Sequence, residues 1–115
     1  MCGIAGLVSS SLDQARLSSV LRRMSLAIAH RGPDDDGIYE TRNRSNHYVG
    51  LVHRRLSIID LSSAGHQPMS NGEGTVWIVF NGEIYNYREL RKMLEKYYRF
   101  ESSTDTEVIL HAYAV

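Results

Sequence analysis

The first third of the chain shows one apolar run typical of a strand and one apolar period typical of a helix. Residues 3–8 are apolar with two glycines among them, which predicts a buried strand whose backbone another segment approaches closely. Over 12–28 the apolar positions recur every three or four residues, and this spacing predicts an amphipathic helix. Ser11 and Gln14 resemble a capping box at its start, and a Gly-Pro step at 32–33 predicts its end.

The next segments predict a hairpin, a short strand and a long loop. Residues 37–41 and 47–53 have the composition of two strands, and the polar stretch 42–46 predicts the turn that joins them. A third short strand is expected over 56–59. Residues 60–74 contain Ser, Gly, Pro and Asn without a sustained period, so we expect a loop there.

One hydrophobic segment and two helical patterns complete the chain. Residues 75–80 are β-branched and aromatic, which predicts a central strand covered on both faces. A second helix is predicted to begin at a capping box at Asn86 and to end near Tyr98, and Thr104 with Glu107 predicts a third that runs to the last residue. Early strands with flanking helices indicate an α+β or layered α/β class.

Composition narrows the classes of partner. The 115 residues are enough for one domain, and 13 basic residues balance 13 acidic ones. A net charge of zero argues against nucleic acid and anionic membranes as partners and suits a small neutral or zwitterionic ligand. The chain has neither an apolar run of about 18 residues nor the basic start of a signal peptide, so we expect a cytoplasmic protein without a membrane segment.

The single cysteine, Cys2, is the first candidate for chemistry. One cysteine forms no internal disulfide and builds no cysteine-based metal site. Removal of Met1 would make Cys2 the first residue, and its α-amine, with an ordinary pKa of about 7.7 to 8.0, would then serve as the base for its own thiol. The alternative is a buried structural cysteine.

Asn81 and Gly82 are the second candidate, because they follow the most hydrophobic strand at its end. Rigid scaffolds often present polar groups to a ligand from such positions. An asparagine amide and a glycine N–H can donate two hydrogen bonds to a tetrahedral oxyanion, and losing such a contact costs about 3 to 4 kcal/mol of activation free energy. The alternative is that Asn-Gly is only a tight turn.

Charged residues supply candidates for binding an amino-acid substrate. Arg54 and Arg55 stand at the end of a predicted strand, and a guanidinium can hold an α-carboxylate through two parallel hydrogen bonds. The alternative is surface arginines on an edge strand. Asp105 can accept hydrogen bonds from an ammonium group, or it can simply favour the dipole of the helix that it precedes. The five histidines lack metal-site spacing, so no metal is assigned.

Six segments carry a resemblance to a known family. They are MCGIAG (1–6), HRGPD (30–34), HRRLSIID (53–60), GHQPM (65–69), FNGEIYN (80–86) and STDTE (103–107). In this order they resemble the motifs of the class II glutamine amidotransferases, and specifically those of the glutaminase domain of asparagine synthetases. Such domains hydrolyse glutamine to glutamate and ammonia, so the resemblance implies that reaction for the chain.

The resemblance also implies roles for individual residues. Cys2 would be the nucleophile and its freed amine the general base, with Asn81 and Gly82 donating to the oxyanion. Arg55 would bind the substrate carboxylate, and Glu83 and Asp105 would bind the substrate amine. Arg54 lies one place before the matching arginine and receives no role.

The family's fold and length add further expectations. The resemblance implies an α+β fold of the N-terminal-nucleophile hydrolase type, an αββα sandwich. The family's domain continues further, so residues 1–115 are expected to be its N-terminal part, truncated before the second sheet is complete and without a synthetase domain. ATP and magnesium would belong to that domain in a parent protein that makes asparagine from aspartate, so no cofactor is expected here. Expected partners are glutamine and either a second copy or a synthetase domain, with no nucleic acid and no membrane.

Two other interpretations stay open at this point. The chain can be a non-catalytic module that keeps the motifs by descent, folds partly or oligomerises, and turns over nothing. An unrelated α+β binding domain would require the six motifs to be coincidence. The first alternative differs from the enzyme in whether Cys2 is reactive.

Overall fold

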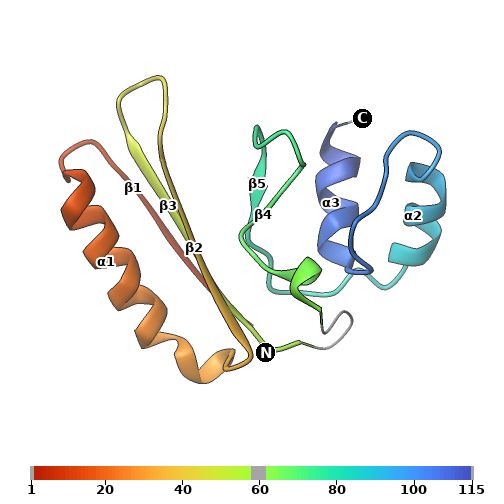
Figure 1. The fold of residues 1–115 in the computed structure, drawn as a ribbon, viewed down its shortest axis with the longest axis horizontal. Helices are drawn as coiled ribbons and strands as arrows, with labels where there is room; N and C mark the ends of the chain where they lie inside the picture. The colour runs from red at the N-terminus through yellow and green to blue at the C-terminus, as the bar shows by residue number, and fades with distance from the viewer. Residues whose placement is uncertain (1, 58–61, 115) are drawn as a thin grey trace.

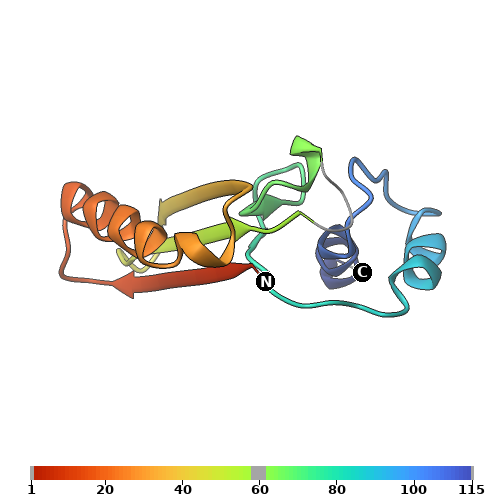
Figure 2. The ribbon, with the colours of Figure 1, turned by 90° about the horizontal axis from the view of Figure 1, so that it is seen from below.

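The computed structural model describes residues 2–57 and 62–114, which form an α+β arrangement of four successive layers (Figure 1). A helix covers a three-stranded antiparallel sheet, a two-stranded sheet lies against the other face, and two more helices lie beyond it. Figure 2 shows the same succession from below. The elements are β1 (Gly3–Ser9), α1 (Gln14–Ala27), β2 (Asp35–Arg42), β3 (Tyr48–Arg55), β4 (Met69–Ser70), β5 (Trp77–Ile78), α2 (Tyr87–Leu94) and α3 (Asp105–Ala114), with short 3-10 helices at Ala29–Arg31 and Ser63–Gly65.

The helix α1 and the sheet enclose an apolar core. The sheet has the order β1-β3-β2, and β3 lies antiparallel to both of its neighbours. Leu17 and Leu21 of α1 and Val52 of β3 are fully buried against each other. Gly50 makes this close packing possible, since a Cβ there would lie 2.5 Å from a methyl group of Leu21. Full burial of each of these side chains contributes roughly 1.5 to 3 kcal/mol.

The predicted first strand and first helix are confirmed, with two corrections. The N-cap of α1 is Asp13, whose Oδ1 accepts from the backbone N–H of Arg16 at 2.8 Å, and the predicted capping box at Ser11 is wrong. The strand β1 is half-exposed where a buried strand was predicted. Its alternate residues face away from α1, and there Val8 is 66% exposed. The close approach expected at its glycines is present, since a Cβ on Gly6 would lie 2.9 Å from the carbonyl of the paired strand.

The predicted hairpin is confirmed as β2 and β3. The side chain of Asn43 stabilises the turn, because its Oδ1 accepts from the N–H groups of Ser45 and His47. A third short strand was expected over 56–59. Residues 56–57 follow the end of β3 and are not in strand conformation, and residues 58–59 lie outside the described residues.

The strand predicted over 75–80 is wrong in length and setting. Only Trp77 and Ile78 are in strand conformation, both are half-buried, and they pair with β4 alone among the described residues. The side chain of Asn71 accepts from the N–H groups of Thr75 and Val76, which closes a turn where strand was expected. The loop predicted over 60–74 is interrupted by the second 3-10 helix and by β4, and residues 60–61 lie outside the described part.

The two later helices are confirmed with different ends. The side chain of Asn86 makes no cap hydrogen bond, and α2 ends at Leu94, whose carbonyl accepts from the N–H groups of residues 97 and 98. Thr104 does cap α3, because its hydroxyl accepts from the N–H of Glu107 at 3.4 Å. The last residue, to which this helix was expected to run, lies outside the described residues.

Aromatic stacking joins the two sheets. The ring of Tyr39 on β2 stacks on the ring of Trp77 on β5, with 3.8 Å between centroids and an angle of 12° between the planes. The helix α3 packs on β4 and β5, and α2 packs on α3. This stacking holds the two-stranded sheet over the face of the larger sheet opposite α1.

Candidate active site

A cavity of about 340 Å³ lies where the larger sheet, the segment after β5 and the start of α3 meet. This volume lies within the range of small-molecule sites. All six residues assigned from the sequence line it, although they come from four separate parts of the chain. The full lining is Cys2, Arg55, Leu56, Gly65, Gln67, Phe80, Asn81, Gly82, Glu83, Tyr85, Thr104, Asp105 and Thr106.

Cys2 is placed in the cavity by strand pairing. Gly3 of β1 pairs with Arg54 of β3, so the residue before β1 lies beside the residues that follow β3. The N–H of Leu56 donates to Sγ of Cys2 at 3.3 Å, and Sγ lies 3.6 Å from the carbonyl oxygen of Leu56. The carbonyl of Cys2 accepts from Nε of Arg31 at 3.2 Å. Leu56 therefore holds the thiol, Arg31 holds the backbone of Cys2, and the residue is half-buried.

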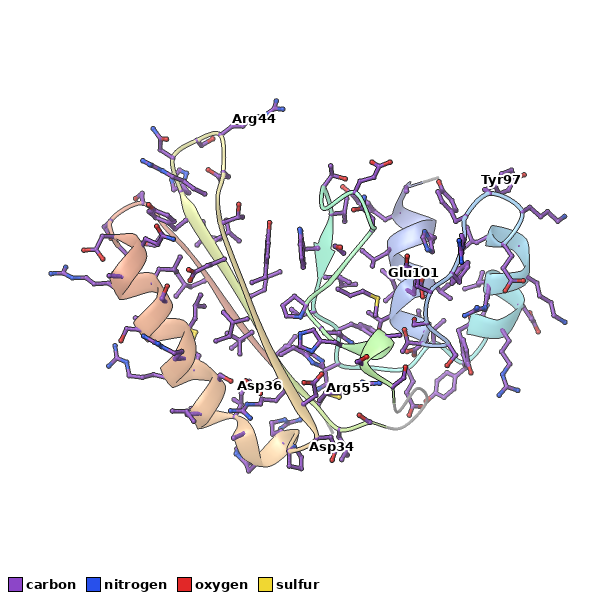
Figure 3. The ribbon with its side chains drawn as sticks, in the orientation of Figure 1. Asp34, Asp36, Arg44, Arg55, Tyr97 and Glu101 are labelled. Atoms are coloured by element: carbon purple, nitrogen blue, oxygen red, sulfur yellow. The ribbon has the colours of Figure 1, made fainter. Side chains whose placement is uncertain are left out.

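The pleat of β3 sends its two consecutive arginines to opposite faces of the sheet. Arg54 turns toward α1, where its Nε donates to the carbonyl and the hydroxyl of Ser25 at 3.0 Å each. Arg55 turns toward the cavity and is 6% exposed, and its guanidinium donates to the carbonyl of Ser62 at 2.7 Å. Arg54 pairs with Asp36 of β2, so these two residues share a face of the sheet. Figure 3 labels Asp36 on one side of the sheet and Arg55 on the other. Only Arg55 of this pair lines the cavity.

Gly65 is required for this arginine position. A Cβ at residue 65 would overlap the guanidinium group of Arg55 and would lie 3.1 Å from a methyl group of Thr104. The absence of a side chain therefore lets Arg55 reach along the cavity wall toward the start of α3.

The backbone of Phe80 fixes the segment that carries Asn81, Gly82 and Glu83. Its N–H donates to Oε1 of Gln67 at 2.7 Å, and its carbonyl lies 3.3 Å from Nε2 of His53. Asn81 is half-buried, whereas the next two residues are exposed at the mouth of the cavity. The backbone here does not form a tight turn between paired strands, which was the alternative for Asn-Gly.

Asp105 is the first residue of α3 and is 5% exposed. Its Oδ2 accepts from the N–H of Ile84 at 2.9 Å, which ties the start of α3 to the residue after Glu83. Asp105 therefore lies at the start of the helix, where its charge favours the helix dipole, and it also lies in the wall of the cavity. These two interpretations are compatible.

Gln67, Thr104 and Thr106 also line the cavity, although no part in a site was predicted for them and Thr104 was expected only to begin a helix. Gln67 is 7% exposed, and its Nε2 donates to the hydroxyl of Thr106 at 3.1 Å. Gln67 lies in the segment GHQPM (65–69), and Thr104 and Thr106 lie in STDTE (103–107). Their place in these motifs was the only feature of the sequence that pointed to a part in the site. The hydrogen bond between Gln67 and Thr106 joins residues 39 positions apart, and such a contact leaves no periodic pattern of apolar and polar residues in the sequence.

Two buried ionisable groups support the walls of the cavity. Burial lowers the pKa of His53 below its ordinary value, and the charge of Arg55 acts in the same direction. Because a carbonyl can only accept, the Nε2 of this neutral ring carries the proton that faces Phe80. Burial tends to raise the pKa of Glu107, but hydrogen bonds from the Ser102 hydroxyl and from two backbone N–H groups outweigh it and hold that pKa below its ordinary value.

The cavity thus combines a thiol, amide donors, a guanidinium and two carboxylates. This set matches a zwitterionic ligand with a further amide or carbonyl group. Within residues 2–57 and 62–114, no three side chains of His, Cys, Asp or Glu are grouped to hold a metal ion. Over the same residues, no helix has the length and apolar character needed to cross a bilayer.

Comparison with known proteins assigns the family. The profile of the glutamine amidotransferase domain matches residues 1–115. The chain is 45% identical to asparagine synthetase [glutamine-hydrolyzing] 1 of Bacillus subtilis, 41% identical to putative asparagine synthetase [glutamine-hydrolyzing] 2 of Methanocaldococcus jannaschii and 40% identical to asparagine synthetase B [glutamine-hydrolyzing] of Escherichia coli.

Each of these matches covers 98% of the chain but only 17%, 24% and 19% of the respective relative. The chain therefore spans between about a sixth and a quarter of the length of these relatives. The match of the profile from end to end, together with three relatives at 40% identity or more, leads to one conclusion: the chain belongs to the glutamine amidotransferase family.

Proposed function

We propose that the chain hydrolyses glutamine to glutamate and ammonia, with Cys2 as the nucleophile once Met1 has been removed. The observation that carries this proposal is the convergence of Cys2, Arg55, the 81–83 segment and Asp105 on one cavity. A thiol at an N-terminus, donors for an oxyanion and partners for an α-carboxylate and an α-amine are the groups that such a reaction needs.

The proposed reaction begins with attack of the Cys2 thiolate on the side-chain carbonyl carbon of glutamine. The α-amine of Cys2 takes the thiol proton, and the side-chain amide of Asn81 and the N–H of Gly82 donate to the oxyanion. The C–N bond then breaks, and ammonia leaves with a proton returned by the amine. Water, deprotonated by the same amine, attacks the glutamyl thioester and releases glutamate and the thiol.

Substrate orientation is assigned to three charged residues. Arg55 would bind the α-carboxylate of glutamine through its planar set of N–H donors, next to the bond that it donates to Ser62. Asp105 would accept from the α-ammonium group, with Glu83 at the mouth of the cavity as its partner. The N–H of Ile84 already donates to Asp105, so the carboxylate is held in place before a ligand arrives.

The fold supports a larger context for this reaction. Helix, sheet, sheet and helix follow one another across the molecule, and this order is consistent with an αββα sandwich of the N-terminal-nucleophile hydrolases (Figure 1). We assign residues 1–115 to the N-terminal part of a class II glutamine amidotransferase domain. In a parent protein the ammonia would pass to an activated aspartate in a synthetase domain, which would bind the ATP and magnesium.

Labelling of Cys2 tests the proposal directly, because Cys2 is the single cysteine of the chain. We expect the intact mass of the purified protein with a native N-terminus to show loss of Met1 and one adduct after exposure to a glutamine-like diazoketone. Excess glutamine should suppress the adduct, and Cys2→Ala should show neither an adduct nor ammonia release. Retained Met1, or labelling that glutamine does not suppress, would favour a module without catalysis.

A further inference from the structure

Each of the two peptide groups that flank Phe80 is held by one buried side chain, immediately before the residues assigned to the oxyanion. Gln67 accepts the N–H of Phe80 at 2.7 Å, and His53 donates to its carbonyl at 3.3 Å. Both side chains are buried, at 7% and 1% exposure. The carbonyl of Phe80 belongs to the same peptide group as the N–H of Asn81, so the two contacts set the direction in which the chain enters the 81–82 segment.

Gln67 also contacts the opposite wall of the cavity. While its Oε1 accepts from Phe80, its Nε2 donates to the hydroxyl of Thr106 at 3.1 Å, one residue after Asp105. One side-chain amide therefore spans from the segment that carries Asn81 to the first turn of α3. The distance between the proposed oxyanion donors and Asp105 therefore depends on this bridge as well as on the hydrogen bond from the N–H of Ile84 to Asp105.

Gln67 is itself anchored to the larger sheet. A Cβ on Gly37 of β2 would overlap the carbonyl oxygen of Gln67, so the glycine lets this loop lie directly on the strand. The preceding residue, His66, contacts Asp35 of the same strand with 2.6 Å between Nδ1 and Oδ2. Gly37 pairs with His53 across β2 and β3, so both supports of Phe80 start from neighbouring positions on one face of the sheet.

We infer that Gln67 is a positioning residue, which places Asn81 and Gly82 for the oxyanion at a set distance from Asp105. This inference rests on the proposed glutaminase reaction. The oxyanion exists only in the transition state and the tetrahedral intermediate, so donors that move by a fraction of an ångström lower kcat and leave ground-state binding nearly unchanged. Gln67 touches neither the reacting carbon nor the thiol in this assignment.

The test compares three variants that are nearly isosteric. Gln67→Met removes both hydrogen bonds of the bridge, Thr106→Val removes only its far end, and Asn71→Leu removes the turn contacts of the same hairpin without touching Phe80. Relative to wild type, we expect kcat for glutamine to fall about 10- to 100-fold in Gln67→Met and roughly 3- to 10-fold in Thr106→Val. KM should stay within about 3-fold in both, and Asn71→Leu should match wild type.

Inhibition by glutamate γ-semialdehyde gives a second readout. Its aldehyde carbon forms a bond to Sγ of Cys2, the C=O π bond breaks, and the thiol proton passes to the oxygen, which then occupies the oxyanion position. We expect the inhibition constant of the aldehyde to rise in Gln67→Met by about the factor by which kcat falls. The inhibition constant of glutamate, the product, should stay the same as in wild type.

Each outcome separates the inference from the proposal beneath it. An active wild type with a Gln67→Met variant that equals Asn71→Leu would overturn the inference alone. A rise in KM and in the inhibition constant of glutamate together with the loss of kcat would also overturn it, because that pattern indicates a collapsed cavity. A wild type that loses Met1 yet releases no ammonia from glutamine would overturn the glutaminase assignment and the inference together.

Discussion

The half of the molecule built from α1 and the larger sheet is held together differently from the half that follows residue 62. The first half has a core of Leu17, Leu21 and Val52, with partly buried apolar side chains around it. The second half buries a few aliphatic side chains at α2 and α3 but relies on many polar ones. The buried polar residues in or facing it are His53, Arg55, Gln67, Ser102, Thr104, Asp105, Thr106, Glu107 and His111.

This difference separates stability from precision. Apolar burial is non-directional, and it stabilises any arrangement that removes the same area from water. Hydrogen bonds weaken steeply when their angles depart from linear, so a connected set of them defines one geometry. The apolar half is therefore expected to set most of the free energy of unfolding, and the polar half to set where the substrate-binding groups stand.

The largest expected effect is on the apolar half. Leu21→Ala should lower the free energy of unfolding by about 2 to 5 kcal/mol, because it removes a fully buried side chain and leaves a cavity against Gly50. Chemical denaturation at pH 7.5 measures the change. Leu26→Ala on the same helix is the control, since Leu26 is 70% exposed and its loss should cost about 0.5 kcal/mol or less. Equal losses in the two variants would contradict the assignment of the core.

The next effect is on the polar half. Glu107→Gln should cost about 1 to 3 kcal/mol, because the two carboxylate oxygens accept one bond each from the N–H groups of Glu101 and Ser102, and the amide that replaces them has only one oxygen. The turn it supports leads to Asp105, so KM for glutamine should rise as well. Glu101→Gln, which changes an exposed side chain, is the matched control.

The lowered pKa of Glu107 fixes the direction of its pH dependence. Its contribution to the free energy of unfolding is complete above the ordinary pKa of about 4.5 and is lost as the pH falls from there through the lower pKa of the folded state. The difference in stability between wild type and Glu107→Gln should therefore shrink as the pH falls below about 4.5. A difference that stays constant down to pH 3 would show that the charge of Glu107 is not what the turn requires.

The smallest effect concerns the boundary between the halves. The pKa of His53 is lowered from its ordinary 6.5, so below pH 6.5 the unfolded chain binds more protons than the folded one, and stability falls as the pH falls. His53→Gln keeps a donor near the carbonyl of Phe80 and removes the titration. Between pH 7.5 and 5.5 the variant should lose less stability than wild type, by about 1 kcal/mol or less, whereas above pH 7.5 the difference between the two proteins should no longer change with pH.

The apolar half was largely predictable from the sequence. The period of α1 and the pattern of the β2–β3 hairpin are properties of neighbouring residues, and the faces that they bury follow from that spacing. The errors here were local: Asp13 caps α1 where Ser11 was expected, and β1 is half-exposed because the face opposite α1 is only partly covered.

The polar half was less predictable for a physical reason. Residues 75–80 have the composition of a central strand, yet the side chains of Asn71 and Gln67 take the N–H groups at both ends of that segment. Hydrogen bonds between distant side chains and backbone leave no pattern in hydrophobicity. The candidate residues of the cavity were found through ordered motifs, and Gln67 lay inside one of them without a chemical signature that marked it as a bridge.

Because Arg54 and Arg55 point to opposite faces of the sheet, the site depends on the register of β3 with its neighbouring strands. A deletion or insertion of one residue within the strand would exchange the faces of every later side chain. The arginine of the cavity would then lie under α1, and the partner of Ser25 would enter the cavity. Length changes in this family member should be tolerated at the turn near Arg44 and excluded between Tyr48 and Arg55.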